Sequence, residues 1–355
     1  MRFHASKLMI GLVLSGGLVL GACSSAEPSS PETSGPTTVR LLAHDSFVVS
    51  ESLLEQFKKD TGITIEVMTA GDAGAMVAGA VLAAGSPSAD VMFGIDNTLL
   101  SKAVDAEVFS PYTASDADSI VPELRDDTSG GVVTPIDYGD VCINIDDTWF
   151  AKNQVPVPIN IDQLTGKKYK DLLVVEDPAS SSPGLAFMLA TIAKYGENWP
   201  QYWEQLNANG VKVSGSWTDA YESVFSAGRG DRPLVVSYAT SPPAEIVYAE
   251  QPKPSKPSTS VLTDGCYRQI EFAGVLRGTP NEAAARKVVD WLLSAPVQAD
   301  VPLSMFVFPS RANVPLPPVF TKFAARVANP LQLSAADVNA HLSEWLKTWG
   351  QVMGR

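Results

Sequence analysis

Apolar runs typical of strands alternate with helix-like segments in the first folded stretch of the chain. The strand-like runs are TVRLLAHDSF, ITIEVMTA and VMFGID. Between the first two, VVSESLLEQFKKDTG places Leu53, Leu54 and Phe57 at helical spacing and ends at the helix-stopping Gly62. AGAMVAGAVLAAGSPSAD gives a second helix. The order predicts a parallel sheet that binds its ligand at the carboxyl ends of the strands. The polar residues at those ends are His44, Asp45, Ser46, Asp96 and Asn97.

A second alternation follows TPIDYGDVCINID, which we expect to be an extended crossing segment. Its strands are DLLVVEDP, VKVSGS and PLVVSYAT, and its helices are SPGLAFMLATIAKYG and WTDAYESVFSAG. GCYRQIEFAGVLRG then returns as extended chain, and NEAAARKVVDWLLSAPVQADVP and SAADVNAHLSEWLKTWGQVM follow as amphipathic helices. Two α/β lobes joined by two extended crossings are typical of a hinged binding protein.

The N-terminus has the pattern of an export signal. Arg2 and Lys7 precede the apolar stretch Leu8–Leu20, which is too short to span a bilayer comfortably. The string LGAC, ending at Cys23, resembles a bacterial lipobox, in which cleavage leaves a lipid-modified cysteine. We therefore expect a protein anchored by lipid on the extracytoplasmic face of the cell membrane. An ordinary signal peptide and an uncleaved anchor are the alternatives.

These patterns divide the chain into five parts. The stretch SSAEPSSPETSGPTT has almost no apolar residues and cannot offset the entropy of ordering, so we expect a flexible tether. The parts are a signal peptide (1–22), a tether (23–38), a first lobe (39–137), a second lobe (138–266), and a return to the first lobe with C-terminal helices (267–355).

The net charge of the chain limits the kinds of partner that we expect. The formal net charge of −13 argues against nucleic acid and would attract a cationic ligand. The alternative, that acidic side chains only keep an exported protein soluble, stays open.

Two cysteines remain beyond the lipobox, Cys142 after the first crossing and Cys266 before the second. Because an exported protein folds in an oxidising compartment and crossing strands run side by side, we expect a disulfide between them. Two buried free thiols are the alternative.

The chain carries no recognisable catalytic motif. His44 and His341 are the only histidines after the signal segment, and G-x-S-x-G, H-E-x-x-H, C-x-x-C and a phosphate-binding P-loop are all missing from the sequence. The sequence also has no Tyr-Tyr dipeptide, the pattern that would suggest capture of ferric iron by a pair of tyrosines. We expect a binding protein without cofactor or metal, rather than an enzyme.

Carboxylates and aromatic residues supply the candidate ligand contacts. Asp45, Asp96 and Asp137 adjoin apolar strands, where a buried carboxylate is costly unless it is paired, caps a helix or meets a ligand. Aromatic faces bind flat or cationic ligands, although core packing is an alternative for each. The aromatic candidates are Tyr138, Trp217, Tyr238, Phe306 and Phe308.

The string DPASSSPG predicts a helix start. Ser182 is expected as the N-cap and Pro183 as the first helical residue, and the free N–H groups there could bind an anion.

Several strings together resemble bacterial thiamine-binding proteins, the solute receptors of thiamine ABC importers, from about residue 38 to the C-terminus. The matching strings are HDSF, GIDNTLL, DYG, DPASSSPG, WTDAY and SYATSP. The resemblance implies a two-lobe α/β fold of the periplasmic-binding-protein type with a C-terminal helical segment. It also implies a monomeric receptor that closes on thiamine or its phosphates and delivers it to a membrane permease.

The resemblance also implies roles for single residues. Asp96 would face the aminopyrimidine or cationic ring, Trp217 and Tyr238 would line the pocket, and Ser181 would meet a phosphate. The complete predicted ligand site is His44, Asp45, Asp96, Tyr138, Ser181, Ser182, Trp217, Tyr238 and Phe306.

The chain departs from the family where stacking faces are expected. His44 stands for a Tyr, Phe306 for a Trp, Pro243 and Ala244 for an aromatic, and the stretch around Glu51 lacks a Trp. Other receptor ligands therefore stay open, namely a pyrimidine precursor, another small cation, a polyamine or ferric iron. A surface adhesin or sensor built on the same fold is a further alternative.

Overall fold

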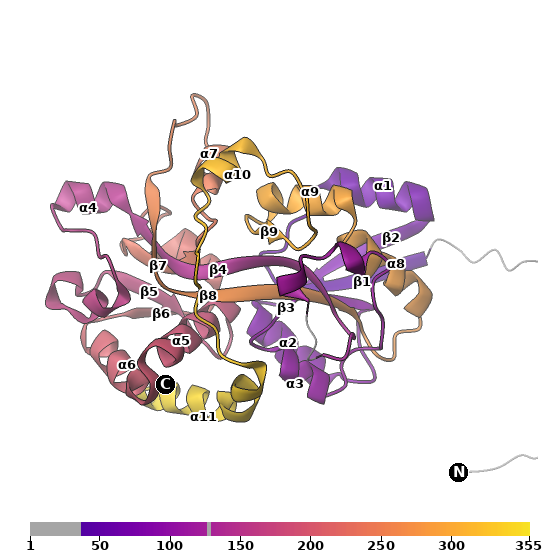
Figure 1. Ribbon diagram of the computed structural model, residues 1–355, viewed down its shortest axis with the longest axis horizontal. Coiled ribbons are helices and arrows are strands. Elements are labelled where there is room, and N and C mark those ends of the chain that lie inside the picture. The colour runs from indigo at the N-terminus through magenta and orange to yellow at the C-terminus, as the bar shows by residue number, and fades with distance from the viewer. Residues whose placement is uncertain (1–36, 126–128) are drawn as a thin grey trace, which may run out of the picture. The chain divides into compact units, whose positions relative to one another are not determined.

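A mixed β-sheet of nine strands runs through the part of the chain that the computed structural model describes, residues 37–125 and 129–355 (Figure 1). The strand order is β2-β1-β3-β8-β4-β7-β5-β6, and β9 pairs with β4. The predicted signal peptide, Cys23 and nearly all of the tether lie outside the described residues. The strands are β1 Thr37–Ala43, β2 Ile63–Thr69, β3 Val91–Asp96, β4 Thr134–Asp146, β5 Leu173–Glu176, β6 Lys212–Ser214, β7 Leu234–Tyr238, β8 Thr259–Val275 and β9 Phe308–Pro309.

Helices pack on both faces of this sheet. Within the two described ranges, no helix combines the length and hydrophobicity needed to cross a bilayer. The α-helices are α1 Glu51–Thr61, α2 Ala73–Leu82, α3 Leu100–Asp105, α4 Asp147–Asn153, α5 Ser182–Tyr195, α6 Trp199–Ala208, α7 Pro243–Val247, α8 Glu282–Leu292, α9 Ala295–Ser304, α10 Pro318–Phe323 and α11 Ala335–Met353.

The two predicted alternations form the two ends of the sheet. β1 pairs in parallel with β2 and β3, and β5 pairs in parallel with β6 and β7. The α/β two-lobe fold is thereby confirmed, with each lobe built around its own parallel strands. Figure 1 shows the long strands β4 and β8 side by side between these two groups.

Strands β4 and β8 join the two ends of the sheet. β4 coincides with the predicted crossing TPIDYGDVCINID and pairs antiparallel with β8 along most of its length. The predicted lobe boundaries at residues 137 and 266 fall inside these two strands, because both lobes share them. The boundaries themselves stay a prediction.

Three local predictions need correction. Helix α5 begins at Ser182 with Ser181 as its N-cap, since Ser181 is extended and its carbonyl accepts the first helical bond from Leu185. The segment predicted as one helix after residue 280 forms α8 and α9, because Ser294 is extended and a new helix begins at Ala295, with Pro296 in its first turn. The helix predicted for WTDAYESVFSAG contains a π-helix over Asp219–Val224.

The two faces of β3 pack in two different clusters of the hydrophobic core. Val91 and Phe93 pack in a cluster with α8, whereas Met92 and Ile95 pack in a second cluster with α2. The register shifts between Phe93 and Ile95 at Gly94, whose φ of +89° favours glycine. A Cβ at Gly94 would lie 2.2 Å from the His44 ring, so this bulge makes room for that side chain.

Cys142 and Cys266 lie on the paired strands β4 and β8, where the structure joins them in a disulfide. Their sequence separation is 124 residues, and both side chains are buried. The disulfide therefore joins β4 to β8 at the point where these two crossing strands leave the second lobe.

Replacing both cysteines with serine should lower the free energy of unfolding by roughly 4–5 kcal/mol, because the unfolded chain regains the freedom of a long loop. Urea unfolding of the domain, with reduced wild type as the matched control, measures this. Two titratable thiols in unfolded, non-reduced wild type would contradict the pairing.

Candidate functional site

A cleft of about 360 Å³ lies between the carboxyl end of β1 and the elements that follow β5, β6 and β7. This volume is within the range of small-molecule sites. Its walls come from both halves of the sheet and from β8. The predicted site residues that line it are His44, Asp45, Ser182, Trp217, Tyr238 and Phe306.

Three predicted site residues lie outside the cleft wall. Tyr138 stacks on Phe308, with ring centroids 5.2 Å apart, and carries the Arg268 guanidinium on its ring. Ser181 is buried and its hydroxyl has no hydrogen-bond partner. Asp96 is fully buried, and its Oδ1 accepts hydrogen bonds from Thr98 and Leu99.

Sequence reasoning missed the other carboxylates of the cleft. Asp72, Glu222 and Glu271 line it together with Asp45. Glu271 could have been found as the one acidic residue in the apolar half of the strand YRQIEFAGVL. Asp72 precedes a helix and had the appearance of a simple cap, which it also is, since its Oδ1 accepts from the N–H of Ala73.

His44 and Glu271 form a buried ion pair at the base of the cleft, with Nε2 and Oε1 3.3 Å apart. Burial lowers the pKa of His44, but the Glu271 carboxylate, with smaller contributions from Asp72 and Asp45, outweighs burial, so the pKa is raised overall. Burial works to raise the pKa of Glu271, but the charge of His44 and the neighbouring Asp137 outweigh it, so the pKa of Glu271 is lowered overall. The contact is an ion pair without a hydrogen bond, since Nε2 of His44 has no hydrogen-bond partner.

Two more carboxyl groups lie behind Glu271. Asp96 on β3 and Asp137 on β4 both pair in register with Glu271 on β8. Burial, followed by the negative charge of the neighbouring Glu271, raises the pKa of Asp137 well above its usual range. Burial likewise raises the pKa of Asp96 to about 7. The arrangement concentrates negative charge on Glu271, the member of the group that reaches the cleft.

Aromatic side chains form the opposite wall. Trp217 stacks on Tyr221 with centroids 5.0 Å apart, and its indole N–H donates to Ser237. Tyr221 follows Trp217 by four residues in WTDAY, a helical spacing that could have indicated the pair. The ring of Tyr238 packs on the backbone of Gly139, where a Cβ would approach it to 2.9 Å.

Tyr248 and Phe306 meet at the rim of the cleft, with centroids 5.5 Å apart. Phe306 has a φ of 55°, which is uncommon for a bulky residue and places its ring in the cleft. Tyr248 is 68% exposed, so its ring is accessible to a ligand.

Hydrogen bonds connect the two walls. The backbone N–H of Trp217 donates to Asp72, and the hydroxyls of Ser46 and Thr218 are 3.3 Å apart. At the same edge, the N–H of Ala75 donates to the carbonyl of Ser180. These contacts join residues before β4 to residues of the second lobe, so the structure shows the cleft with its walls together.

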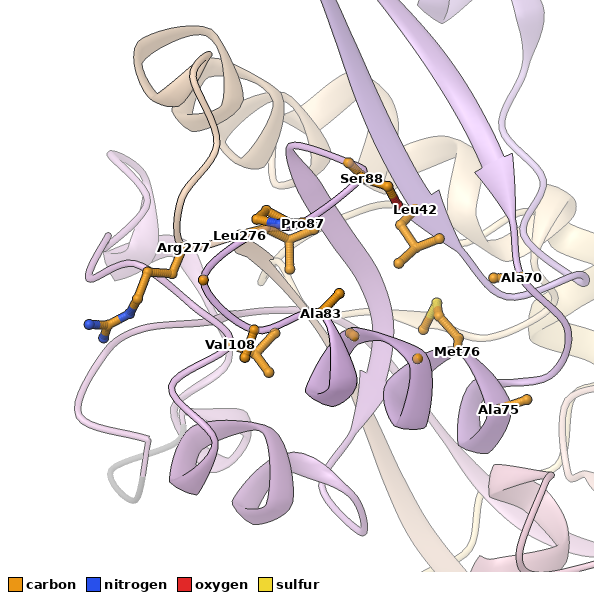
Figure 2. Close-up of a pocket in the computed structure, with 15 residues that line it drawn as sticks. Leu42, Ala70, Ala75, Met76, Ala83, Pro87, Ser88, Val108, Leu276 and Arg277 are labelled. Atoms are coloured by element: carbon orange, nitrogen blue, oxygen red, sulfur yellow. The ribbon is translucent and has the colours of Figure 1, made fainter.

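A second hollow, of about 200 Å³, lies beside α2. Figure 2 shows Leu42, Met76 and Val108 around it, with the charged end of Arg277 directed away. Because no group of charged side chains converges there, the cleft over Glu271 is the better candidate for a charged or polar solute.

Comparisons with known proteins agree with this arrangement. The family model of bacterial extracellular solute-binding proteins matches residues 86–327. The thiamine-binding periplasmic protein of Salmonella typhimurium is 30% identical over 268 residues, which are 75% of this chain and 77% of that protein. The iron uptake protein A2 of Synechocystis is 24% identical over 260 residues, 71% of this chain and 73% of that protein. A solved periplasmic thiamin binding protein superposes with a TM-score of 0.79 at 25% identity, covering 90% of this chain and 96% of that structure.

Replacing Glu271 with glutamine should lower the pKa of His44, because burial then acts without the facing carboxylate. NMR titration of the histidine ring protons measures this, and His341, exposed on α11, serves as the internal reference. An unchanged His44 titration would contradict the ion pair.

The Asp96→Asn variant should flatten the dependence of stability on pH. Wild-type Asp96 keeps its proton up to about pH 7 when folded but loses it near 3.8 when unfolded, so unfolding releases a proton in that window. The contribution of Asp96 to wild-type stability therefore falls as pH rises from 4 to 7, by at most about 1.4 kcal/mol per pH unit.

Urea unfolding at several pH values tests this expectation, with the exposed Asp118→Asn as the matched control. Equal slopes for Asp96→Asn and Asp118→Asn would show that Asp96 is ionised throughout.

Proposed function

The chain belongs to the bacterial extracellular solute-binding proteins, and we propose that it is a receptor for thiamine that delivers its ligand to an ABC importer. Proteins of this family bind and release solutes without transforming them, so the chain is not an enzyme. The observation that carries the proposal is the cleft itself, in which carboxylates and aromatic faces surround a volume suited to a small organic cation.

Thiamine joins an aminopyrimidine to a cationic thiazolium ring, and the cleft offers a partner for each property. Glu271 supplies a buried negative charge, which attracts the cation or accepts from the amino group. Trp217 and Tyr238 supply ring faces for stacking. Asp96 acts on the ligand through the charge of Glu271 rather than by contact, since it lies behind the cleft wall.

Tyr248 offsets part of the lost stacking surface. Ala244 lines the cleft where the family resemblance leads one to expect an aromatic residue, and Tyr248 follows it by four residues. Its ring meets Phe306 at the rim. The pair can cover a flat ligand from the open side.

Ferric iron is the second candidate because an iron uptake protein is among the relatives. Tyrosinate is the ligand expected for that ion. Burial is the first cause that raises the pKa of both Tyr221 and Tyr238, which opposes the tyrosinate form. In the ranges 37–125 and 129–355, no three His, Cys, Asp or Glu side chains are placed to hold one metal ion. The cleft therefore favours the organic cation.

The location follows from the family and is extracytoplasmic. We further propose that Cys23 carries a lipid that anchors the chain to the cell membrane, with residues 23–38 as tether. The mass of the N-terminal peptide of the exported protein tests this. In that compartment the pair Cys142 and Cys266 would be oxidised.

Calorimetry on the domain tests the ligand directly. Thiamine should bind in the micromolar range or tighter with one site, and ferric citrate should produce no visible tyrosinate absorption. Absence of any heat with thiamine up to about 1 mM, which corresponds to a binding free energy near −4 kcal/mol, would refute the assignment.

Replacing Trp217 with leucine should lower the affinity for thiamine by roughly tenfold. The variant loses one aromatic face, whose stacking and cation–π contacts contribute about 1–2 kcal/mol. Trp345→Leu on α11, distant from the cleft lining, is the matched control and should retain wild-type affinity. Equal affinities in both variants would remove Trp217 from the binding surface.

A further inference from the structure

The charge of the cleft bears on which form of thiamine it accepts. Asp45, Asp72, Glu222 and Glu271 line it, and among the described residues no lysine or arginine does. Asp45 and Glu222 are exposed at its edge and Glu271 is buried at its base. A ligand that carries a phosphate would therefore enter a field of like charge.

The nearby cationic groups are already engaged, and His44, which lines the cleft, forms the ion pair with Glu271. Arg268 lies on β8 close to Glu271 in sequence, but its Nε is 2.5 Å from Oδ1 of Asp140. Its guanidinium also packs on the ring of Tyr138, which does not line the cleft. If Arg268 turned away to reach a phosphate, the Asp140 carboxylate would remain buried without its partner in a low-dielectric environment, which is costly.

The start of α5 offers little to an anion. Pro183 has no N–H, and the hydroxyl of Ser182 accepts a hydrogen bond from Gln269 Nε2 at 3.0 Å, which leaves its O–H proton as the donor that this residue can offer a ligand. Gln269 is held in turn by the hydroxyl of Tyr238. Ser181, the serine best placed by sequence to meet a phosphate, is 1% exposed and does not line the cleft.

From these contacts we propose that the cleft selects the unphosphorylated cation: thiamine binds, whereas thiamine monophosphate and diphosphate are rejected by the carboxylates that line the cleft. The inference rests on the proposed function and names the form of the ligand.

Calorimetry at pH 7.5 and low salt with thiamine, thiamine monophosphate and thiamine diphosphate tests the proposal. Thiamine monophosphate should bind more weakly than thiamine by a factor on the order of ten, and the diphosphate more weakly still. The ratio of the affinities for thiamine and its monophosphate should move closer to one at about 0.5 M salt, because exposed charges are screened.

Charge-removing variants separate repulsion from simple crowding. Glu222→Gln should reduce the preference for thiamine over its monophosphate by several-fold, since it removes an exposed charge at the cleft edge. Glu204→Gln, on the exposed side of α6, is the matched control and should keep the wild-type ratio.

The outcomes are distinct. Thiamine binding with equal or tighter binding of its monophosphate overturns the selectivity and leaves the receptor assignment in place. A preference for thiamine that neither salt nor Glu222→Gln reduces overturns the electrostatic cause. A lack of binding by all three compounds overturns the proposed function and the selectivity with it.

Discussion

The buried carboxylate of Glu271 is the constraint on which the arrangement of the site depends. It lies on β8, the strand that pairs with β3 of the first lobe and with β4 of the crossing. An isolated buried charge is costly, so the surrounding groups must compensate it. His44 does so by ion pairing, and the neighbouring Asp137 avoids adding a second charge, because burial and the charge of Glu271 raise its pKa. The position of His44 depends in turn on Gly94, whose missing side chain leaves room for the imidazole ring.

This arrangement places the charged group of the cleft on a strand that both lobes share. β4 and β8 connect the two lobes, and β8 carries Glu271 at the base of the cleft that the aromatic wall also lines. Asp72 has two tasks at the mouth, because it caps α2 with one oxygen and accepts the backbone N–H of Trp217 with the other. A cation that bridges the walls would be sandwiched between a ring face and a carboxylate, and no chemical step is needed for the solute to be captured and released.

Much of the fold could be predicted from the sequence because the periodic segments are strong and well separated. The segment TPIDYGDVCINID corresponds to β4, and Gly62 ends α1 in the left-handed conformation expected of a C-cap. The site was harder to predict from the sequence. Asp96 and Tyr138 were reasonable candidates by position, but the side-chain direction that takes them away from the cleft depends on strand register and on the bulge at Gly94. Glu271 and Tyr248 become part of a site only when segments distant in the sequence pack together, and a single sequence does not reveal that packing.

A crystal structure of the domain grown with thiamine would show where the solute binds. We expect one thiamine in the cleft, with a ring on the face of Trp217 or Tyr238 and its cationic or amino group within about 4 Å of the Glu271 carboxylate. A cleft without ligand beside thiamine bound elsewhere, or a thiamine whose charged ring faces away from Glu271, would contradict this expectation.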